Sequence, residues 1–113
     1  MDQLTCYRDV IRRCVLDHFT YVSRAKANGV EPRCIFDEAR DDYLMAYVGW
    51  DKGRRVWNLA LHACIRDGKI WVEEDNTEDG IAIALVRSGV PQQDIVLAFH
   101  PAELRHLSEF AIA

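Results

Sequence analysis

The densest group of potential metal ligands lies between residues 73 and 80, where the sequence reads EEDNTEDG. Part of this segment fits positions 1, 3, 5 and 6 of a calcium-binding EF-hand loop, namely Asp75, Thr77, Asp79 and Gly80. Position 12, which needs a bidentate glutamate, is Val86, and the residues before the loop alternate as in a strand. The pattern therefore favours a helix start, with Thr77 as the N-cap and the next acidic residues in the first turn.

Other carboxylates match a fragment of a nuclease signature. Asp67-Gly68-Lys69 has the D-x-K spacing of metal-dependent nucleases, and Asp51 is a candidate upstream acid. However, Asp-Gly between two alternating apolar runs is typical of a two-residue hairpin turn, because both positions tolerate a positive φ. A metal-dependent hydrolase is therefore the weakest of three functional hypotheses, and its candidate residues are Asp51, Asp67, Glu73 and Asp75. No metal or other cofactor is predicted.

A cysteine and a histidine lie two residues apart, at His62 and Cys64, in a run that alternates as a strand. A nucleophilic pair needs a thiolate within hydrogen-bond reach of its base and a third group that orients the base. Residues i and i+2 of a strand lie about 7 Å apart, so a direct bond is not expected. The remaining cysteines form no CxxC pair, which is typical of reduced thiols in a cytoplasmic protein. We expect a non-enzymatic protein with no catalytic residues.

The elements that position these residues follow from apolar periodicity. Apolar residues recur every three or four positions from Leu4 to Val22 and predict a long helix with Asp2 as its N-cap. Four strands joined by short polar turns follow, at residues 33–39, 43–50, 55–65 and 69–74. A short helix ending before Gly89, a buried strand and a last helix at residues 102–110 complete the chain. The prediction is a single α+β domain over residues 1–113, an antiparallel β-meander of about four to five strands with a long N-terminal helix and two shorter C-terminal helices.

Charge and hydropathy limit the functional classes. The 113 residues carry a net charge of -4, and an acidic chain is a poor stand-alone ligand for nucleic acid. Two basic pairs remain as candidate phosphate contacts for a DNA-binding accessory factor that biases a recombinase: Arg12, Arg13, Arg54 and Arg55. No apolar run approaches the roughly 20 residues of a membrane span, and the N-terminus lacks the pattern of a signal peptide, so a cytoplasmic location is expected.

The predicted meander has apolar residues on both faces, whereas a sheet with one solvated face alternates apolar with polar residues. The second face is therefore covered either by a helix of this chain or by another protein. The candidate partner-binding residues on that face are Tyr43, Met45, Tyr47, His62, Trp71 and Glu73.

Several segments together resemble the XisI-like family, named for a controlling factor of fdxN element excision in cyanobacteria. They are YRDVI, IFDEARDDYLMAYVGWD and RRVWNLALHACIRDGKIWVEEDNTEDGIAIALVRSGVPQQDIVLAFHP. The resemblance extends from about Leu4 to Phe110, and its most specific parts are Gly49-Trp50-Asp51, residues 67–71, residues 75–78, and Gly89-Val90-Pro91 with residues 94–100. The loop from Tyr21 to Pro32 departs from it, being longer and more basic than the family pattern.

The resemblance implies a small α+β fold around an antiparallel sheet and a role in programmed excision of a DNA element in heterocyst-forming cyanobacteria. A separate site-specific recombinase cuts and joins the DNA there, and the family has no established catalytic residues. It is usually paired with XisH-like proteins, which look like members of the PD-(D/E)xK nuclease superfamily. We therefore expect a regulatory protein that docks an XisH-like partner. A homodimer that buries the second sheet face is also compatible, and direct DNA contact stays open.

Overall fold

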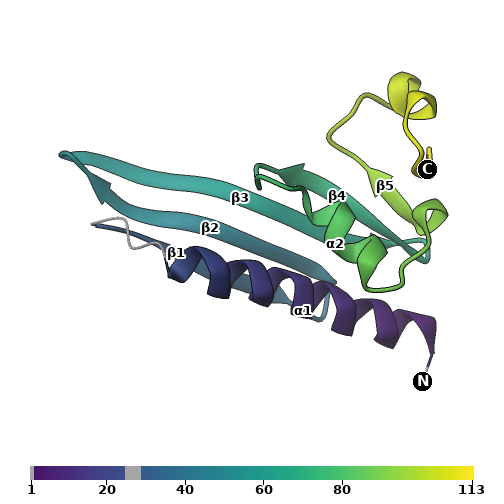
Figure 1. The fold of residues 1–113 in the computed structure, drawn as a ribbon, viewed down its shortest axis with the longest axis horizontal. Coiled ribbons are helices and arrows are strands. Elements are labelled where there is room, and N and C mark those ends of the chain that lie inside the picture. The colour runs from purple at the N-terminus through teal and green to yellow at the C-terminus, as the bar shows by residue number, and fades with distance from the viewer. Residues whose placement is uncertain (1, 25–28) are drawn as a thin grey trace.

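The computed structural model describes residues 2–24 and 29–113, and its elements confirm the α+β class (Figure 1). Their order is α1 (Gln3–Ser23), β1 (Val30–Asp37), β2 (Asp42–Asp51), β3 (Arg54–Arg66), β4 (Lys69–Asp75), α2 (Ile81–Arg87), the 3₁₀ turn η1 (Gln92–Asp94), β5 (Ile95–Leu97) and the 3₁₀ helix η2 (Ala102–Leu107). The sheet order is β1-β2-β3-β4-β5. The first four strands form the predicted antiparallel meander, but β5 pairs with β4 in parallel.

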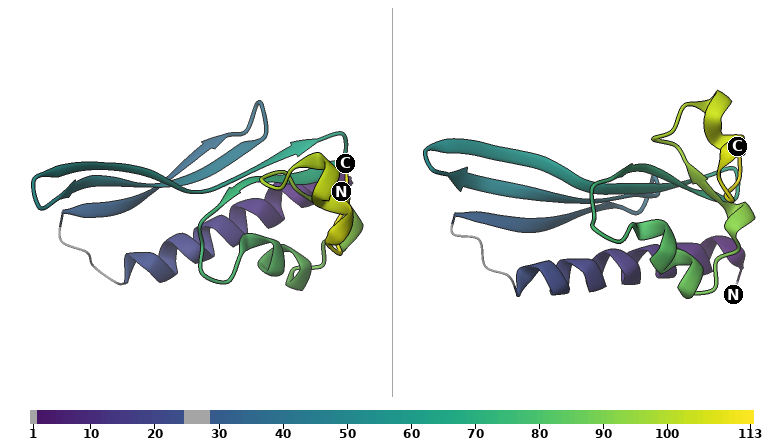
Figure 2. Two further views of the ribbon diagram at one scale, coloured as in Figure 1. Left: turned by 90° about the horizontal axis from the view of Figure 1, so that it is seen from above. Right: turned by 45° about the horizontal axis from the view of Figure 1, so that its top comes forward.

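Helix α1 begins as its sequence predicts. The Asp2 carboxylate accepts a hydrogen bond of 2.7 Å from the main-chain N–H of Thr5 and so satisfies one free donor of the first turn. The apolar stripe then packs against the sheet through five buried residues: Tyr7, Val10, Ile11, Cys14 and Val15. Helix α2 lies beside α1, and both cover the same face of the sheet (Figure 2).

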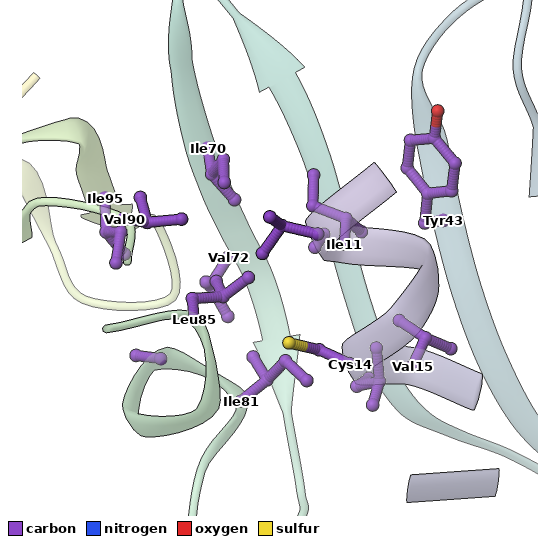
Figure 3. Close-up of a cluster of buried hydrophobic side chains, with 14 of the residues drawn as sticks. Ile11, Cys14, Val15, Tyr43, Ile70, Val72, Ile81, Leu85, Val90 and Ile95 are labelled. Carbon is purple, nitrogen blue, oxygen red and sulfur yellow. The ribbon is translucent and has the colours of Figure 1, made fainter. Parts of the chain in front are cut away.

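The core lies between these two helices and the inner face of the sheet (Figure 3). Strands β2, β3 and β4 contribute fully buried residues to it: Tyr43, Met45, Leu61, Ala63, Ile70 and Val72. Leu85 of α2 and Ile95 of β5 are also fully buried. Each large apolar side chain buried in this way stabilises the fold by about 1.5–3 kcal/mol.

The start of α2 differs from the prediction that Thr77 is the N-cap. The helix begins at Ile81, and the carboxylate of Asp75 accepts main-chain hydrogen bonds from Ile81 at 2.7 Å and from Thr77 at 3.0 Å. The hydroxyl oxygen of Thr77 instead accepts from the N–H of Gly80, which has a φ of 84°. Glu78 and Asp79 therefore lie before the first turn and not within it as predicted, and the carboxylate of Asp75, the last residue of β4, accepts from the first N–H of the helix.

The C-terminal end of α2 matches its prediction. Gly89 has a φ of 102°, and the N–H of Val90 donates to the carbonyl of Leu85 at 3.1 Å, which satisfies a free carbonyl of the last turn. Val90 is buried against the core. The helix predicted over residues 102–110 is a 3₁₀ helix ending at Leu107, closed by i to i+3 bonds such as Leu104 N–H to Pro101 O at 2.9 Å.

Strand β1 begins three residues before its predicted start and contains Pro32. A proline inside a strand is tolerated here because β1 is an edge strand and the missing donor leaves no ladder bond unmade. The predicted Asn28-Gly29 helix end lies partly outside the described residues. Within the described parts of the chain, no helix combines the length and apolar character that a membrane crossing requires.

Candidate interaction surface

The face of the sheet opposite α1 is open along β1, β2 and the first half of β3. Residues paired across antiparallel strands point to the same side, and Ile35 pairs with Leu44 while Trp57 pairs with Val48. Trp50 is 58% exposed, Trp57 55% and Ile35 44%. We call the uncovered apolar residues on this side the open face: Ile35, Leu44, Trp50, Trp57 and Leu59.

At the other end of the sheet, the C-terminal segment folds back over the same side. Trp71 is 9% exposed and packs in a cluster with Cys64, Val96 and Ala111. Its indole N–H donates to the carbonyl of Arg66 at 3.1 Å, and two guanidinium groups lie over its ring, those of Arg66 at 4.2 Å and Arg105 at 5.6 Å. Figure 2 shows this segment beside β5, away from the long β2–β3 hairpin.

The six predicted partner-binding residues do not share one face, so that part of the prediction is wrong. Tyr43 and Met45 are fully buried beneath α1, and Tyr47 packs partly against the same core. The other three lie on the opposite side, where Trp71 is buried and only His62 and Glu73 are partly exposed. Whether any of the six contacts a partner stays a prediction.

Sequence reasoning chose the wrong set of alternating residues on β2 because alternation separates two faces without saying which one meets α1. Trp50 and Trp57, the largest exposed side chains of the open face, were missed for this reason. The sequence did contain a signal for Trp50, because it belongs to the same set of every-second residues as Leu44, Ala46 and Val48.

The His62 and Cys64 side chains have different hydrogen-bond partners, which agrees with the prediction that their spacing does not allow a direct bond. His62 Nε2 lies 2.8 Å from Asp42 Oδ1, whereas the Cys64 thiol donates to Glu73 Oε1 at 3.6 Å. Burial, together with the nearby carboxylates of Glu73 and Asp42, raises the pKa of Cys64 to about 12. The thiol therefore stays protonated at neutral pH and is a poor nucleophile.

A groove between α1 and α2 holds a second buried thiol. Its lining includes Cys14, His18, Glu78 and Ser88. The sulfur of Cys14 lies 3.6 Å from Ser88 Oγ, and burial raises the pKa of this thiol as well. Cys14 is therefore also a neutral packing residue.

The carboxylates named for a hydrolase do not converge. Asp51 is the last residue of β2 and Asp67 is the first residue after β3, so the length of β3 separates them by roughly 40 Å. Asp67, with a φ of 52°, occupies the predicted hairpin turn, and Asp75 caps α2. Among residues 2–24 and 29–113, no three His, Cys, Asp or Glu side chains are placed to hold a metal ion.

The two basic pairs also lie apart. Arg12 forms ion pairs with Asp9 and with Glu38, which lies in the β1–β2 turn. Arg54 and Arg55 begin β3 at the other end of β2, roughly 30 Å away along that strand. Arg13 is exposed, but it does not join a continuous basic surface with the second pair. The guanidinium of Arg55 lies 5.6 Å from the Trp50 ring, at the edge of the open face.

The Gly49-Trp50-Asp51 motif has a structural cause. A Cβ atom on Gly49 would lie 1.9 Å from the carbonyl oxygen of Gly29, and the Trp50 N–H donates to that same oxygen at 2.7 Å. Only glycine permits this approach, which ties the start of β1 to the end of β2. The motif therefore fixes the backbone that carries Trp50 on the open face.

Comparison with known proteins agrees with this fold. The family model for XisI protein matches residues 1–112. The chain belongs to the XisI family. The crystal structure of the fdxN element excision controlling factor XisI from Anabaena variabilis is similar to this XisI-family chain, with 41% identity and a TM-score of 0.84, covering 99% of this chain and 100% of that one. A XisI-like protein from the same organism has 29% identity and a TM-score of 0.89, covering 97% and 99%. No curated protein matches this XisI-family chain.

Proposed function

We propose that this XisI-family chain is a non-catalytic controlling factor of DNA-element excision that acts by binding a protein partner through its open face. The observation that carries the proposal is the exposure of Trp50 and Trp57 beside Arg55 on one sheet face. Tryptophan and arginine are enriched among the few residues that contribute most of the binding energy of protein interfaces. The 41% identical neighbour, described as an excision controlling factor, supports the role.

The partner we propose is an XisH-like, nuclease-like protein. A protein that holds DNA carries a basic channel, and the net charge of -4 on this chain would speed its encounter with such a protein. Bound there, the chain would control access to the DNA without cutting it. This proposal assigns no reaction to any residue of the chain.

Co-purification with the cognate XisH-like protein tests the proposal. We expect a complex whose affinity falls at least tenfold in a Trp50→Ala, Trp57→Ala double variant. Leu107→Ala is a matched control, because Leu107 is 75% exposed but lies in η2, away from the open face. Failure of the wild-type chain to associate at low salt, or equal losses in the control, would contradict the proposal.

A second candidate function is direct DNA contact by the tip of the β2–β3 hairpin. Lys52, Arg54 and Arg55 are exposed within this tip and place positive charge at one end of the molecule (Figure 1). Binding of this kind weakens steeply as salt rises, because phosphate contacts release counterions. Gel shifts at low salt with DNA from the ends of the excised element test this candidate function. An Arg54→Ala, Arg55→Ala variant should lose the shift.

A further inference from the structure

Only half of the β3 edge that faces β4 is paired with another strand. Strand β3 has 13 residues and β4 has 7, so β4 pairs with β3 only between Leu61 and Arg66. Asn76 ends this pairing, since its N–H donates to Ala60 O at 2.8 Å and its side-chain amide to Leu59 O at 3.0 Å. Beyond that point, within the described chain, residues 54–58 pair with β2 alone.

The direction of the free main-chain groups follows from the neighbouring strand. The Trp50 N–H donates to Gly29 O, so the polar groups of Trp50 point toward β1. Trp50 pairs with Arg55, and the antiparallel pattern then turns the N–H and C=O of Arg55 away from β2. Trp57, two residues along, has the same orientation. The edge thus presents a donor and an acceptor at both positions to solvent.

We infer that this edge pairs antiparallel with the same edge of a second copy of the chain, around a two-fold axis through Val56. Arg55 of one copy lies opposite Trp57 of the other, and the two exchange both main-chain hydrogen bonds. Arg54 lies opposite Asn58. The interface is isologous, so every contact occurs twice, and the two sheets join into one. The inference does not depend on the proposed function.

Self-complementarity favours a second copy over an unrelated strand. The register places each Arg55 guanidinium opposite an indole, a favourable cation–π arrangement, and opposes no two like charges at paired positions. A groove beside the edge is lined by Trp57, Asn58, Glu74 and others. An antiparallel second strand carries its basic turn at Lys52 toward Glu74 of the first copy, so the charges at the two ends of the interface are opposite.

The edge is short, so the dimer is expected to be weak. Five paired residues bury less surface than a standard interface, and we expect a dissociation constant on the order of 10 µM. Sedimentation equilibrium of the full chain between micromolar and millimolar concentrations measures it directly. A wild-type chain that stays monomeric throughout this range overturns the inference, even if the same edge binds another protein.

Proline at position 55 tests whether main-chain pairing holds the dimer. The Arg55 N–H points away from β2, so Arg55→Pro removes a donor that the monomer does not use, while Arg55→Ala removes only the side chain. We expect Arg55→Pro to weaken dimerisation at least tenfold and clearly more than Arg55→Ala, with the circular dichroism spectrum unchanged. Equal dimerisation of the two variants overturns the inference.

Opposite charges at position 58 test the register. Asn58 is exposed and lies opposite Arg54 in the proposed dimer. We expect Asn58→Glu to tighten the dimer roughly threefold to tenfold through two symmetric ion pairs, and Asn58→Arg to weaken it by a similar factor. Shifts of both variants in the same direction would show a different register and overturn the pairing around Val56.

Discussion

The two ends of the sheet use tryptophan in opposite ways. At the β4–β5 end, Trp71 is 9% exposed, because the C-terminal segment covers the outer face while α1 and α2 cover the inner one. At the hairpin end, Trp50 and Trp57 are more than half exposed on the same outer face. The difference arises because the C-terminal segment packs over the outer face only at the β4–β5 end, and not from the strands themselves. Stability is therefore concentrated at one end, and the other end is left available for recognition.

Alanine substitution of the two kinds of tryptophan should give the largest difference. Trp71→Ala removes a buried indole, its hydrogen bond to Arg66 and its packing against Ala111, and we expect a loss of about 3–5 kcal/mol in the free energy of unfolding. Trp57→Ala should cost less than about 1 kcal/mol. Urea denaturation measures both. Equal losses would mean that the open face also carries stability.

Gly49→Ala tests whether the hairpin end is anchored at one point despite its open face. The new Cβ would meet the Gly29 carbonyl at 1.9 Å, and neither main chain can yield without breaking the adjacent hydrogen bond. We expect a loss of about 2–3 kcal/mol in the free energy of unfolding. Gly53→Ala is the control, because a Cβ there meets nothing within 4 Å and only the positive φ of 80° is strained. Its loss should be about 1 kcal/mol.

Removing the Asp75 cap should have an intermediate effect at the covered end. Asp75→Ala leaves the N–H groups of Ile81 and Thr77 without their acceptor, and we expect a loss of about 1–2 kcal/mol by thermal unfolding. Thr77→Ala should cost less, because its hydroxyl accepts from a single main-chain N–H, that of Gly80, and its other bond is donated to the Asp75 carboxylate itself. A larger loss for Thr77→Ala would restore threonine as the main cap.

The Cys64 thiol should make the covered end sensitive to alkali. The folded-state pKa of Cys64, about 12, lies above the ordinary value of 9.0. The contribution of this thiol to the free energy of unfolding is therefore complete below pH 9 and is lost as the pH rises toward 12. The slope of unfolding free energy against pH in this window should be shallower in Cys64→Ser, by up to about 1.4 kcal/mol per pH unit. Exposed Cys6 provides the contrast, since it should react with a thiol reagent at pH 8 while Cys64 does not.

Local chemistry made much of this fold predictable from the sequence. The Asp67-Gly68 turn, the Asp2 cap and the Gly89 helix end each depend on a few adjacent residues, and all three are confirmed. The parallel pairing of β5 with β4 was not predicted, because the intervening α2 connection determines it over a long range.

The candidate site was harder to predict for the same reason. Alternation on β2 identifies two sets of residues, but the burial of Tyr43 and the exposure of Trp50 depend on where α1 packs. The hydrogen bond from the Ile81 N–H to Asp75 was not predicted, because a strand residue here caps a helix six positions later, beyond the usual local signature. The covering of Trp71 depends on Ala111, forty positions away in the chain.

The unequal lengths of β3 and β4 also bear on solubility. A bare strand edge can recruit further strands without limit, which is how ordered aggregates grow. Here the exposed stretch of β3 is short and begins at Arg54 and Arg55. Their charges would repel the same arginines of a neighbouring strand in any in-register stack. Replacing both arginines with isoleucine would remove that repulsion, and the chain would be expected to precipitate on storage while its fold stayed intact.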